Sequence, residues 1–405
     1  MGGGLLQLVA YGAQDVYLTG NPQITFFKVV YRRHTNFAIE SIEQTFNGNP
    51  GYGNRVTCQI SRNGDLIHRM YLAVKQGTNG SDGCGYFGLR LIDYVELEIG
   101  GQKIDKQYSH WMYIWNELSL PRGKRDGYYK MINREGTAGS EELYIPLEFW
   151  FCRNVGLALP LIALQYHEVK VNILFQTEAK CAFDGATGPV LDSASLWVDY
   201  IFLDTDERRR FAQLSHEYLI EQLQFTGAEA VSGTQAKPKL SFNHPCKELY
   251  WFVTADYDSG QYLTNQNWFN YTKTPHSGNA TTVELALDTT TTRGVTSINA
   301  ISTAKLVLNG NDRFSERPGS YFNLIQPFQH HENVPSNRGI NVYSFALKPE
   351  EHQPSGTLNM SRIDTAALNL TLDLASTATS SLNVYAVNYN VLRILSGMGG
   401  LAYSN

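Results

Sequence analysis

The stretch SLWVDYIFLDTDERRRFAQLSHEYLIEQLQFTG, from Ser195 to Gly227, decides how the chain is organised. Apolar residues follow a period-2 pattern along its first third, with Val198 on one face and Trp197 on the other. Because both faces carry apolar side chains, the pattern predicts a strand that is buried on both sides.

A short helix and a second strand follow within the same stretch. Residues 204–206 offer N-cap oxygens, and Phe211 and Tyr218 continue at helical spacing. A new strand pattern begins at Leu219 and closes at Gly227. Since the stretch lies at the midpoint of the chain, it predicts a hinge between two similar halves.

The chain of 405 residues is too long for one core and predicts two domains of about 200 residues each. Its 35 glycines and 12% aromatic residues are typical of turn-rich β proteins. We expect an N-terminal arm over residues 1–24, a first β domain over residues 25–213 and a second over residues 214–405. The apolar arm packs either on its own body or on a neighbouring subunit.

Charge and cysteine usage exclude several functional classes. A net charge of −5, with no basic block longer than residues 208–210, disfavours a nucleic-acid partner. Five scattered cysteines without a CxxC pair predict buried free thiols in a reducing compartment such as the cytosol. No run of 18 apolar residues occurs, so we expect no membrane-spanning segment.

Short strands separated by turns fill the first half. We predict them over residues 24–31, 38–46, 55–60, 66–74, 93–99, 143–151, 161–175 and 195–203. Eight such strands are typical of a jelly roll. Between residues 106 and 137 the spacing becomes helical, and the aromatic residues there, such as Trp111 and Trp115, predict core packing rather than a ligand pocket.

The second half repeats landmarks of the first in the same order. Phe46-Asn47-Gly48 matches Phe225-Thr226-Gly227, and Leu97-x-Ile99-x-Gly101 matches Leu306-x-Leu308-x-Gly310. Tyr144-x-x-Leu147 with Gly156 matches Ser344-x-x-Leu347 with Gly356. One such match is weak, but three in order indicate a duplicated β domain whose two units pack side by side.

A search for catalytic groups predicts none, and we expect no enzyme activity, cofactor or metal. The cluster at residues 330–332, His-His-Glu, lacks the spacing of a zinc site and predicts a solvated loop. The acidic run at residues 204–207 is a helix cap rather than a cation site. The acidic pairs at residues 141–142 and 350–351 are interpreted as solvated, and residues 397–400 as a flexible tail.

Three asparagines are possible glycan acceptors because they match the Asn-x-Ser/Thr pattern outside strand-like sequence. They are Asn79, Asn270 and Asn279. The cytosolic interpretation argues against their modification by host enzymes.

Eight dense stretches, which together run from end to end, carry a resemblance to a known family. Among them are LVAYGAQDVYLTGNPQITFFKVVYRRHTNFAIESI (8–42), VELEIGGQKIDK (95–106), GLALPLIALQYHEVK (156–170), WVDYIFLDT (197–205), YSFALKPEEHQPSGTLNMSRID (343–364) and NYNVLRILSGMGGLAY (388–403). The chain resembles the major capsid proteins of large icosahedral double-stranded DNA viruses, most closely those of algal chlorella viruses. The sequence differs from this family in the loops at residues 77–88 and 255–292 and in the helical insertion. Such differences are expected of a minor capsid paralogue with the same fold.

The resemblance implies an all-β chain of two consecutive eight-stranded jelly rolls with short helical insertions. It implies a homotrimer that forms a pseudo-hexagonal capsomer and tiles the outer capsid over an internal membrane. The implied partners are neighbouring capsomers and minor capsid proteins, without direct nucleic-acid contact. The resemblance also implies a glycoprotein of the virion, made in the host cytoplasm and modified by viral enzymes at asparagines outside the usual pattern, with residues 265–279 as the favoured region.

A second function from another class stays open at this stage. A carbohydrate-binding or carbohydrate-cleaving β-sandwich would also use the 24 tyrosines and 6 tryptophans of this chain. A stable trimer without hydrolase activity favours the capsid subunit, whereas a glycan-binding monomer favours the alternative.

Overall fold

The computed structural model describes residues 9–10, 12–22, 34–77, 82–139, 142–183, 187–256, 268–273, 299–374 and 379–403. The chain forms two compact units, Met1–Phe37 and Ala38–Asn405. The first contains α2 (Val16–Thr19), and its Val16 and Tyr17 have exposed side chains. The strand expected over residues 24–31 lies outside the described residues. The arm at residues 1–24 and the domain division after residue 213 stay predictions.

Eight antiparallel strands form a sandwich in the first half of the larger unit. Its two sheets have the orders β1-β9-β3-β6 and β2-β8-β4-β5, and the short β7 also pairs with β3. The strands are β1 (Phe37–Gln44), β2 (Arg55–Gln59), β3 (Leu66–Gln76), β4 (Ile92–Ile99), β5 (Gln102–Tyr108), β6 (Glu142–Pro146), β7 (Leu159–Pro160), β8 (Val169–Phe175) and β9 (Leu191–Leu203). The helices are α3 (Phe87–Leu91), α4 (Ser109–Ser119), α5 (Arg122–Met131), α6 (Trp150–Arg153), η1 (Val155–Leu157) and α7 (Glu178–Cys181).

The second half repeats this architecture after the connecting helix α8 (Thr205–Gln213). Its sheets have the orders β10-β20-β13-β17 and β12-β19-β14-β15. The strands are β10 (His216–Phe225), β12 (Gln235–Ala236), β13 (Pro245–Asp256), β14 (Ile301–Leu308), β15 (Asn311–Asp312), β17 (Asn341–Ser344), β19 (Ala366–Leu372) and β20 (Thr379–Leu395). Short additions are β11 (Glu229–Val231), β16 (Arg317–Pro318), β18 (Leu358–Asn359), β21 (Met398–Leu401), the π-helix η3 (Tyr321–Ile325), α10 (Gln326–His330) and η4 (Met360–Arg362).

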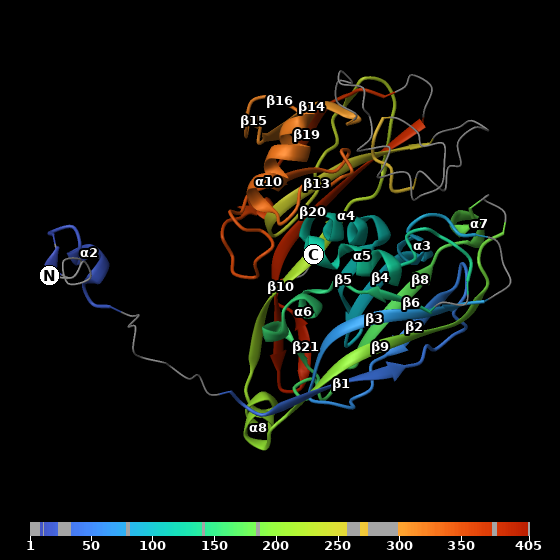
Figure 1. Cartoon of the computed structure of the whole chain (residues 1–405), viewed down its shortest axis with the longest axis vertical. Coiled ribbons are helices and arrows are strands. Elements are labelled where there is room, and N and C mark those ends of the chain that lie inside the picture. Colours follow the sequence, from blue (N-terminus) through green and yellow to red (C-terminus); the bar gives the residue numbers. More distant parts are fainter. Residues whose placement is uncertain are drawn as a thin grey trace. The chain divides into compact units, whose positions relative to one another are not determined.

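The two halves match strand for strand. The path β1-β9-β3-β6 corresponds to β10-β20-β13-β17, and β2-β8-β4-β5 corresponds to β12-β19-β14-β15. Two sandwiches of eight antiparallel strands with this order are two jelly rolls. The expected all-β fold, with two consecutive jelly rolls and helical insertions, is therefore confirmed, and Figure 1 shows the two sets of strands on either side of α4.

The landmarks that predicted a duplication occupy equivalent turns. Gly48 follows β1 with a φ of 105°, and Gly227 follows β10 with a φ of 107°. The β4–β5 hairpin turns through Gly100 and Gly101, while the β14–β15 hairpin turns through Asn309 and Gly310, all four at positive φ. Two consecutive positive φ values are required by a type I′ hairpin, which is why glycine and asparagine recur there.

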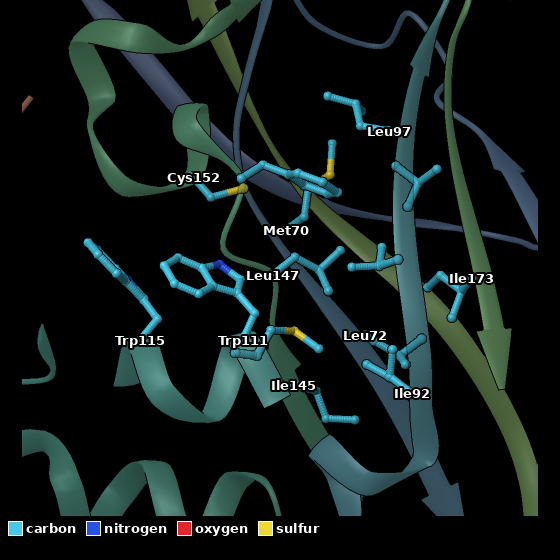
Figure 2. Close-up of a cluster of buried hydrophobic side chains, with 14 of the residues drawn as sticks. Met70, Leu72, Ile92, Leu97, Trp111, Trp115, Ile145, Leu147, Cys152 and Ile173 are labelled. Carbon is cyan, nitrogen blue, oxygen red and sulfur yellow. The ribbon is translucent and has the colours of Figure 1, made fainter. Parts of the chain in front are cut away.

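The first hydrophobic core lies between the sheets of the first jelly roll and α4. Met70 and Leu72 are alternate residues of β3 and both point into it, because successive side chains of a strand point to opposite faces. Figure 2 shows Trp111 of α4 beside Leu147 and Met70, with Ile173 of β8 across the sandwich. Each large apolar side chain buried here contributes about 1.5–3 kcal/mol relative to an exposed one. A separate core fills the second jelly roll.

Two predicted strands have different boundaries in the structure. The strand predicted over residues 143–151 ends at Pro146, and α6 follows it. The strand predicted over residues 161–175 begins only at Val169, because residues 161–168 form turns with bonds such as Leu164 N to Leu161 O (3.1 Å). Leu161 and Leu164 are nevertheless buried, which explains why the apolar pattern of this segment resembled that of a strand.

The prediction of a flexible tail at residues 397–400 is wrong. Residues 398–400 belong to β21, which pairs with β20 through Leu395–Met398 and Arg393–Gly400, and Gly397 lies in the turn before it. Ser396 and Gly397 have φ values of 52° and 81°, which allow the two-residue turn between the strands.

All five cysteines are buried with free thiols, as their spacing predicted. Among the described residues, no helix is long and apolar enough to cross a membrane.

Candidate functional site

The two jelly rolls meet along a buried surface, which we call the junction. On the second jelly roll it is the outer face of the sheet β10-β20-β13-β17. Along β13, Leu249 and Trp251 point into the second core, while Tyr250 and Phe252 join the first core. The sheet is therefore covered on both sides, and one of its two covers belongs to the other half of the chain.

Helix α4 supplies the aromatic centre of the junction. Trp111 and Trp115 are four residues apart and so share one face of the helix. The Trp111 ring meets Tyr250 at 5.1 Å and Tyr385 at 6.3 Å, in edge-to-face geometry at both contacts. Such pairs add about 0.5–1.5 kcal/mol beyond their buried area. The prediction that these aromatics form core packing is confirmed, and the core they build joins the two halves.

His110, the neighbour of Trp111, makes polar and stacking contacts across the junction. Its Nδ1 lies 2.8 Å from the Tyr271 hydroxyl, and its ring stacks on Trp268 at 4.7 Å. Burial lowers the pKa of His110 to about 3, with the nearby Arg90 guanidinium as a second cause. The imidazole is therefore neutral at pH 7. Arg90 itself is buried and lies over the Trp268 ring at 3.3 Å, a cation–π contact that joins the two halves.

A layer of buried charges crosses the junction beside the aromatic residues. Glu221 of β10 accepts from Arg153 of α6 at 2.9 Å and from Lys247 of β13 at 2.7 Å. Lys247 has no exposed area, and it also donates to the Pro349 carbonyl at 2.6 Å. Burial alone would raise the pKa of Glu221, but the two cations outweigh burial and lower it. Glu221 is therefore ionised and fixes a cation from each half.

His331 lies in a second ionic cluster, so the prediction of a solvated loop at residues 330–332 is wrong for His331, whereas Glu332 is exposed. Its Nε2 lies 2.9 Å from Glu248 Oε1 and its Nδ1 lies 2.8 Å from Glu350 Oε1, with no exposed side-chain area. Tyr250 donates to the other oxygen of Glu248. Burial alone would lower the pKa of His331, but the two carboxylates raise it to about 9. Glu350 is bonded to His331 but its side chain is 23% exposed, so it is solvated only in part, whereas Glu351 is exposed and pairs with Lys348.

Asp105 in the middle of β5 contacts the first strand of the second jelly roll. Its carboxylate accepts from Leu223 N at 3.0 Å and from Gln107 Nε2 at 2.9 Å. Gln222 donates beside it to the Ile104 carbonyl. Burial raises the pKa of Asp105 to about 6, because these hydrogen bonds only partly replace hydration of the charged form.

The C-terminal strand β21 also belongs to the junction. Leu401 N donates to Gln102 Oε1 at 3.1 Å, and Gly399 contacts His167 Nδ1 through both its carbonyl (2.8 Å) and its amide (3.1 Å). Tyr166 N donates to the Gly397 carbonyl at 2.9 Å. The end of the second jelly roll is thus bonded to the first.

The connecting helix α8 is held at its N-terminal end. The Asp204 side chain accepts from Thr205 N at 2.7 Å, so the predicted N-cap is confirmed. Asp65 accepts from Leu203 N at 2.9 Å and pairs with Arg208 at 3.0 Å. The hinge is therefore attached to the body of the first jelly roll and is not a loose linker.

The hinge differs from its sequence prediction in two respects. The helix ends at Gln213, and β10 begins at His216 instead of Leu219, with the His216 ring stacked on Phe211 at 5.4 Å. On β9, Ile201 is buried as predicted, but Trp197 on the same face is only half-buried. The second face of this strand is therefore incompletely covered within one chain.

A half-open cavity of about 550 Å³ lies at the junction, and its lining includes Arg69, Arg153, Glu221 and His352. Arg153 and Glu221 of this lining pair with each other at 2.9 Å. No group of His, Cys, Asp or Glu side chains within the described ranges could hold a metal ion.

The three possible glycan acceptors are not brought together. Asn79 and Asn279 lie outside the described residues. Asn270 is 3% exposed, and its Oδ1 accepts from the amide and the hydroxyl of Thr272 at 3.0 and 2.6 Å. Its burial argues against attachment of a glycan to the folded chain, and acceptor status stays a prediction for all three. Glu141 also lies outside the described residues, while Glu142 is exposed as expected.

Sequence reasoning missed the charged residues of the junction. Arg153, Glu221 and Lys247 are spread over almost 100 positions and belong to no motif. One local signal was present: Glu221 and Lys247-Glu248 interrupt otherwise apolar strand sequence. A charge within a buried strand requires a partner, so these positions could have been marked as buried ion pairs.

Comparisons with known proteins agree with this architecture. Residues 25–204 match a family model described as the N-terminus of major capsid proteins, and residues 207–400 match one described as the major capsid protein of large eukaryotic DNA viruses. The major capsid protein of Pyramimonas orientalis virus is 55% identical, and that of Paramecium bursaria Chlorella virus 1 is 48% identical, each with both chains fully covered. A chain in the quasi-atomic model of the PBCV-1 virus capsid superimposes with a TM-score of 0.80 at 43% identity, covering 94% of this chain and all of that one.

Proposed function

This chain belongs to the family of major capsid proteins of large eukaryotic DNA viruses, and we propose that three copies of it form a pseudo-hexagonal capsomer of the outer shell. It is a structural subunit of the virus capsid. The related PBCV-1 chain is placed in a virus capsid model, which supports assembly with neighbouring subunits.

The junction is the observation that carries this proposal. A homotrimer has threefold symmetry, whereas a tile in a hexagonal lattice has six neighbours. Two similar jelly rolls in each chain supply six similar corners, provided that they are held in a fixed relation. The aromatic contacts of α4, the ion pairs of Glu221 and the bonds of β21 fix that relation within one chain.

The remaining expectations on partners and location belong to the same proposal. The homotrimers contact neighbouring capsomers and minor capsid proteins, and the shell that they form lies over an internal membrane. The protein is made in the host cytoplasm and carries glycans from viral enzymes. We infer no catalytic role, because Glu221, Lys247 and His331 of the junction are bound in ion pairs.

Purified full-length protein tests the oligomeric state. Size-exclusion chromatography with light scattering should give three times the mass of the chain. Negative-stain images of the same sample should show particles with a six-cornered outline. A monomer that binds oligosaccharides would contradict the proposal and favour a carbohydrate-binding β-sandwich.

A further inference from the structure

We propose that each subunit of the trimer inserts three apolar residues of its second jelly roll, Ile325, Phe328 and Leu347, against the outer face of the first jelly roll of the next subunit. Within one chain, the junction covers the outer face of a sheet of one jelly roll with residues of the other. The proposed contact does the same between two chains. This inference rests on the proposed trimer and names the surfaces that form it.

The receiving surface is an aromatic stripe on the sheet β1-β9-β3-β6, formed by Ile39, Tyr71, Tyr144 and Trp197. Each residue comes from a different strand of that sheet. The Tyr71 ring stacks on Trp197 at 6.2 Å and meets Tyr144 edge-on at 5.8 Å. Ile39 is 50% exposed and Tyr144 is 36% exposed, while Tyr71 and Trp197 are half-buried. An apolar surface of this kind on a capsid subunit marks a contact site.

The equivalent face of the second jelly roll is already covered. Tyr71 and Tyr250 are separated by 179 positions, the offset that also separates Phe46 from Phe225. Tyr71 faces Trp197 across β3 and β9, as Tyr250 faces Tyr385 across β13 and β20. Tyr250 and Tyr385 are nevertheless almost completely buried, because Trp111 of α4 packs on both of them. One of two equivalent faces therefore has its cover within the chain, and the other lacks one.

The second jelly roll carries the matching insertion. Helix α4 lies between β5 and β6 of the first jelly roll, and η3 with α10 lies between the equivalent strands β15 and β17. Ile325 and Phe328 lie three residues apart on this helical segment, which places them on one face. They are 45% and 78% exposed, and Leu347, whose carbonyl contacts His330 at the end of α10, is 72% exposed. We call these three exposed apolar residues the knob; two of them lie on the insertion that corresponds to the one carrying Trp111.

Two histidines at the end of α10 hold the knob in place. The His330 side chain contacts the Leu347 carbonyl at 3.0 Å, which ties α10 to the segment after β17. His331 then fixes the end of α10 to Glu248 of β13 and to Glu350. An anchored apolar knob loses little conformational entropy on docking, which is what a strong contact requires.

The arrangement closes on itself. The knob and the stripe are different surfaces, so a contact between them is heterologous, and a heterologous contact forms a ring when its rotation closes. Within a chain, α4 covers the sheet that follows the hinge. Between chains, the knob covers the first sheet of the next copy. Three copies then have three junctions within chains and three similar contacts between chains. These six contacts alternate around one axis.

The test uses single charges on the two surfaces of the full-length chain. Phe328→Asp and Ile39→Asp should each raise the concentration at which the trimer dissociates about tenfold or more, with unchanged circular dichroism. The matched control is Leu395→Asp, because Leu395 is 64% exposed at the C-terminal end of β20 and lies on neither surface. It should leave the trimer as stable as the wild type.

A photo-crosslinking phenylalanine analogue at position 328 locates the partner surface. In trimers mixed from light and heavy-isotope subunits, it should join a light chain to a heavy chain at peptides from β1, β3, β6 or β9. Crosslinks confined to residues 1–36, or to the same chain, would overturn the inference. A trimeric wild type whose two charge variants stay trimeric would overturn it alone, whereas a monomeric wild type would overturn the proposed function as well.

Discussion

Arg153 of the first jelly roll lies 2.9 Å from Glu221 of the second, and Lys247 approaches the same carboxylate at 2.7 Å from within the second jelly roll. Glu221 is 8% exposed and Lys247 is fully buried. One carboxylate therefore balances a cation from each side of the junction.

Replacing Glu221 by glutamine should destabilise the chain strongly. Glu221→Gln leaves a buried ammonium without its counter-charge, which typically costs about 3–5 kcal/mol of unfolding free energy. The control is Glu217→Gln on the same strand, because the Glu217–Arg393 pair is exposed and such pairs contribute about 0–1 kcal/mol. Guanidinium denaturation measures both changes. Equal effects of the two substitutions would show that the junction pair contributes no more than a surface pair.

Asp105 should make stability fall as the pH rises. Its folded pKa of about 6 lies above the usual value near 4, so the folded chain retains a proton that the unfolded chain releases. The contribution of protonated Asp105 to the free energy of unfolding is complete below pH 4 and is lost as the pH rises through 6. The free energy changes by about 3 kcal/mol over this range. Asp105→Asn, whose carbonyl can still accept from Leu223 N, should lack this component of the pH profile. Parallel profiles for variant and wild type would refute the assignment.

The contribution of His331 to the stability of the fold should decrease at alkaline pH. The carboxylates of Glu248 and Glu350 raise its folded pKa to about 9, so its contribution is complete below the unfolded value near 6.5 and is lost as the pH rises through 9. The stability difference between wild type and His331→Gln should therefore shrink between pH 6 and pH 10. His330→Gln is the control, since the neighbouring His330 contacts the Leu347 carbonyl rather than a carboxylate. A constant difference for both variants would mean that His331 is neutral.

The N-terminal arm should be dispensable for folding and necessary for assembly. Met1–Phe37 is a unit separate from Ala38–Asn405, and Val9 and Tyr17 are 73% and 91% exposed. Docking of the arm on an assembly partner would bury such residues, at about 25 cal/mol per Å² of apolar area. Deletion of residues 2–21 should leave soluble trimers that fail to form shells with the other capsid proteins. A deletion variant that does not fold would show that the arm belongs to the core.

The strands and the duplication could be predicted because their signals are local. Alternation along β3 and β9 and the turns at Gly48 and Gly227 need only neighbouring residues, and each turn type restricts which residues fit. The domain architecture followed from finding the same turns twice. The resemblance to capsid proteins then named the jelly roll.

The junction could not be predicted because its contacts join residues far apart in the chain. His331 has the surroundings of a loop in sequence and becomes buried only when Glu248 and Glu350 converge on it. Likewise, Gly397–Gly400 resembles a tail until His167 and Gln102 bind the strand that it forms. Trp197 is the opposite case. The apolar sequence around it predicted that it would be buried, but within one chain it is only half-buried.

The rigidity of the hinge tests the central claim most directly, and limited trypsin digestion of the intact trimer measures it. Because Asp65 holds Arg208 at 3.0 Å and Asp204 caps the helix, the bonds after residues 208–210 should survive until surface loops have been cut. A chain with a flexible Gly-Ser insertion after Asp206 is the positive control and should be cut at the hinge first. Early cleavage at residues 208–210 in the wild-type trimer would show two independent jelly rolls and contradict the rigid tile.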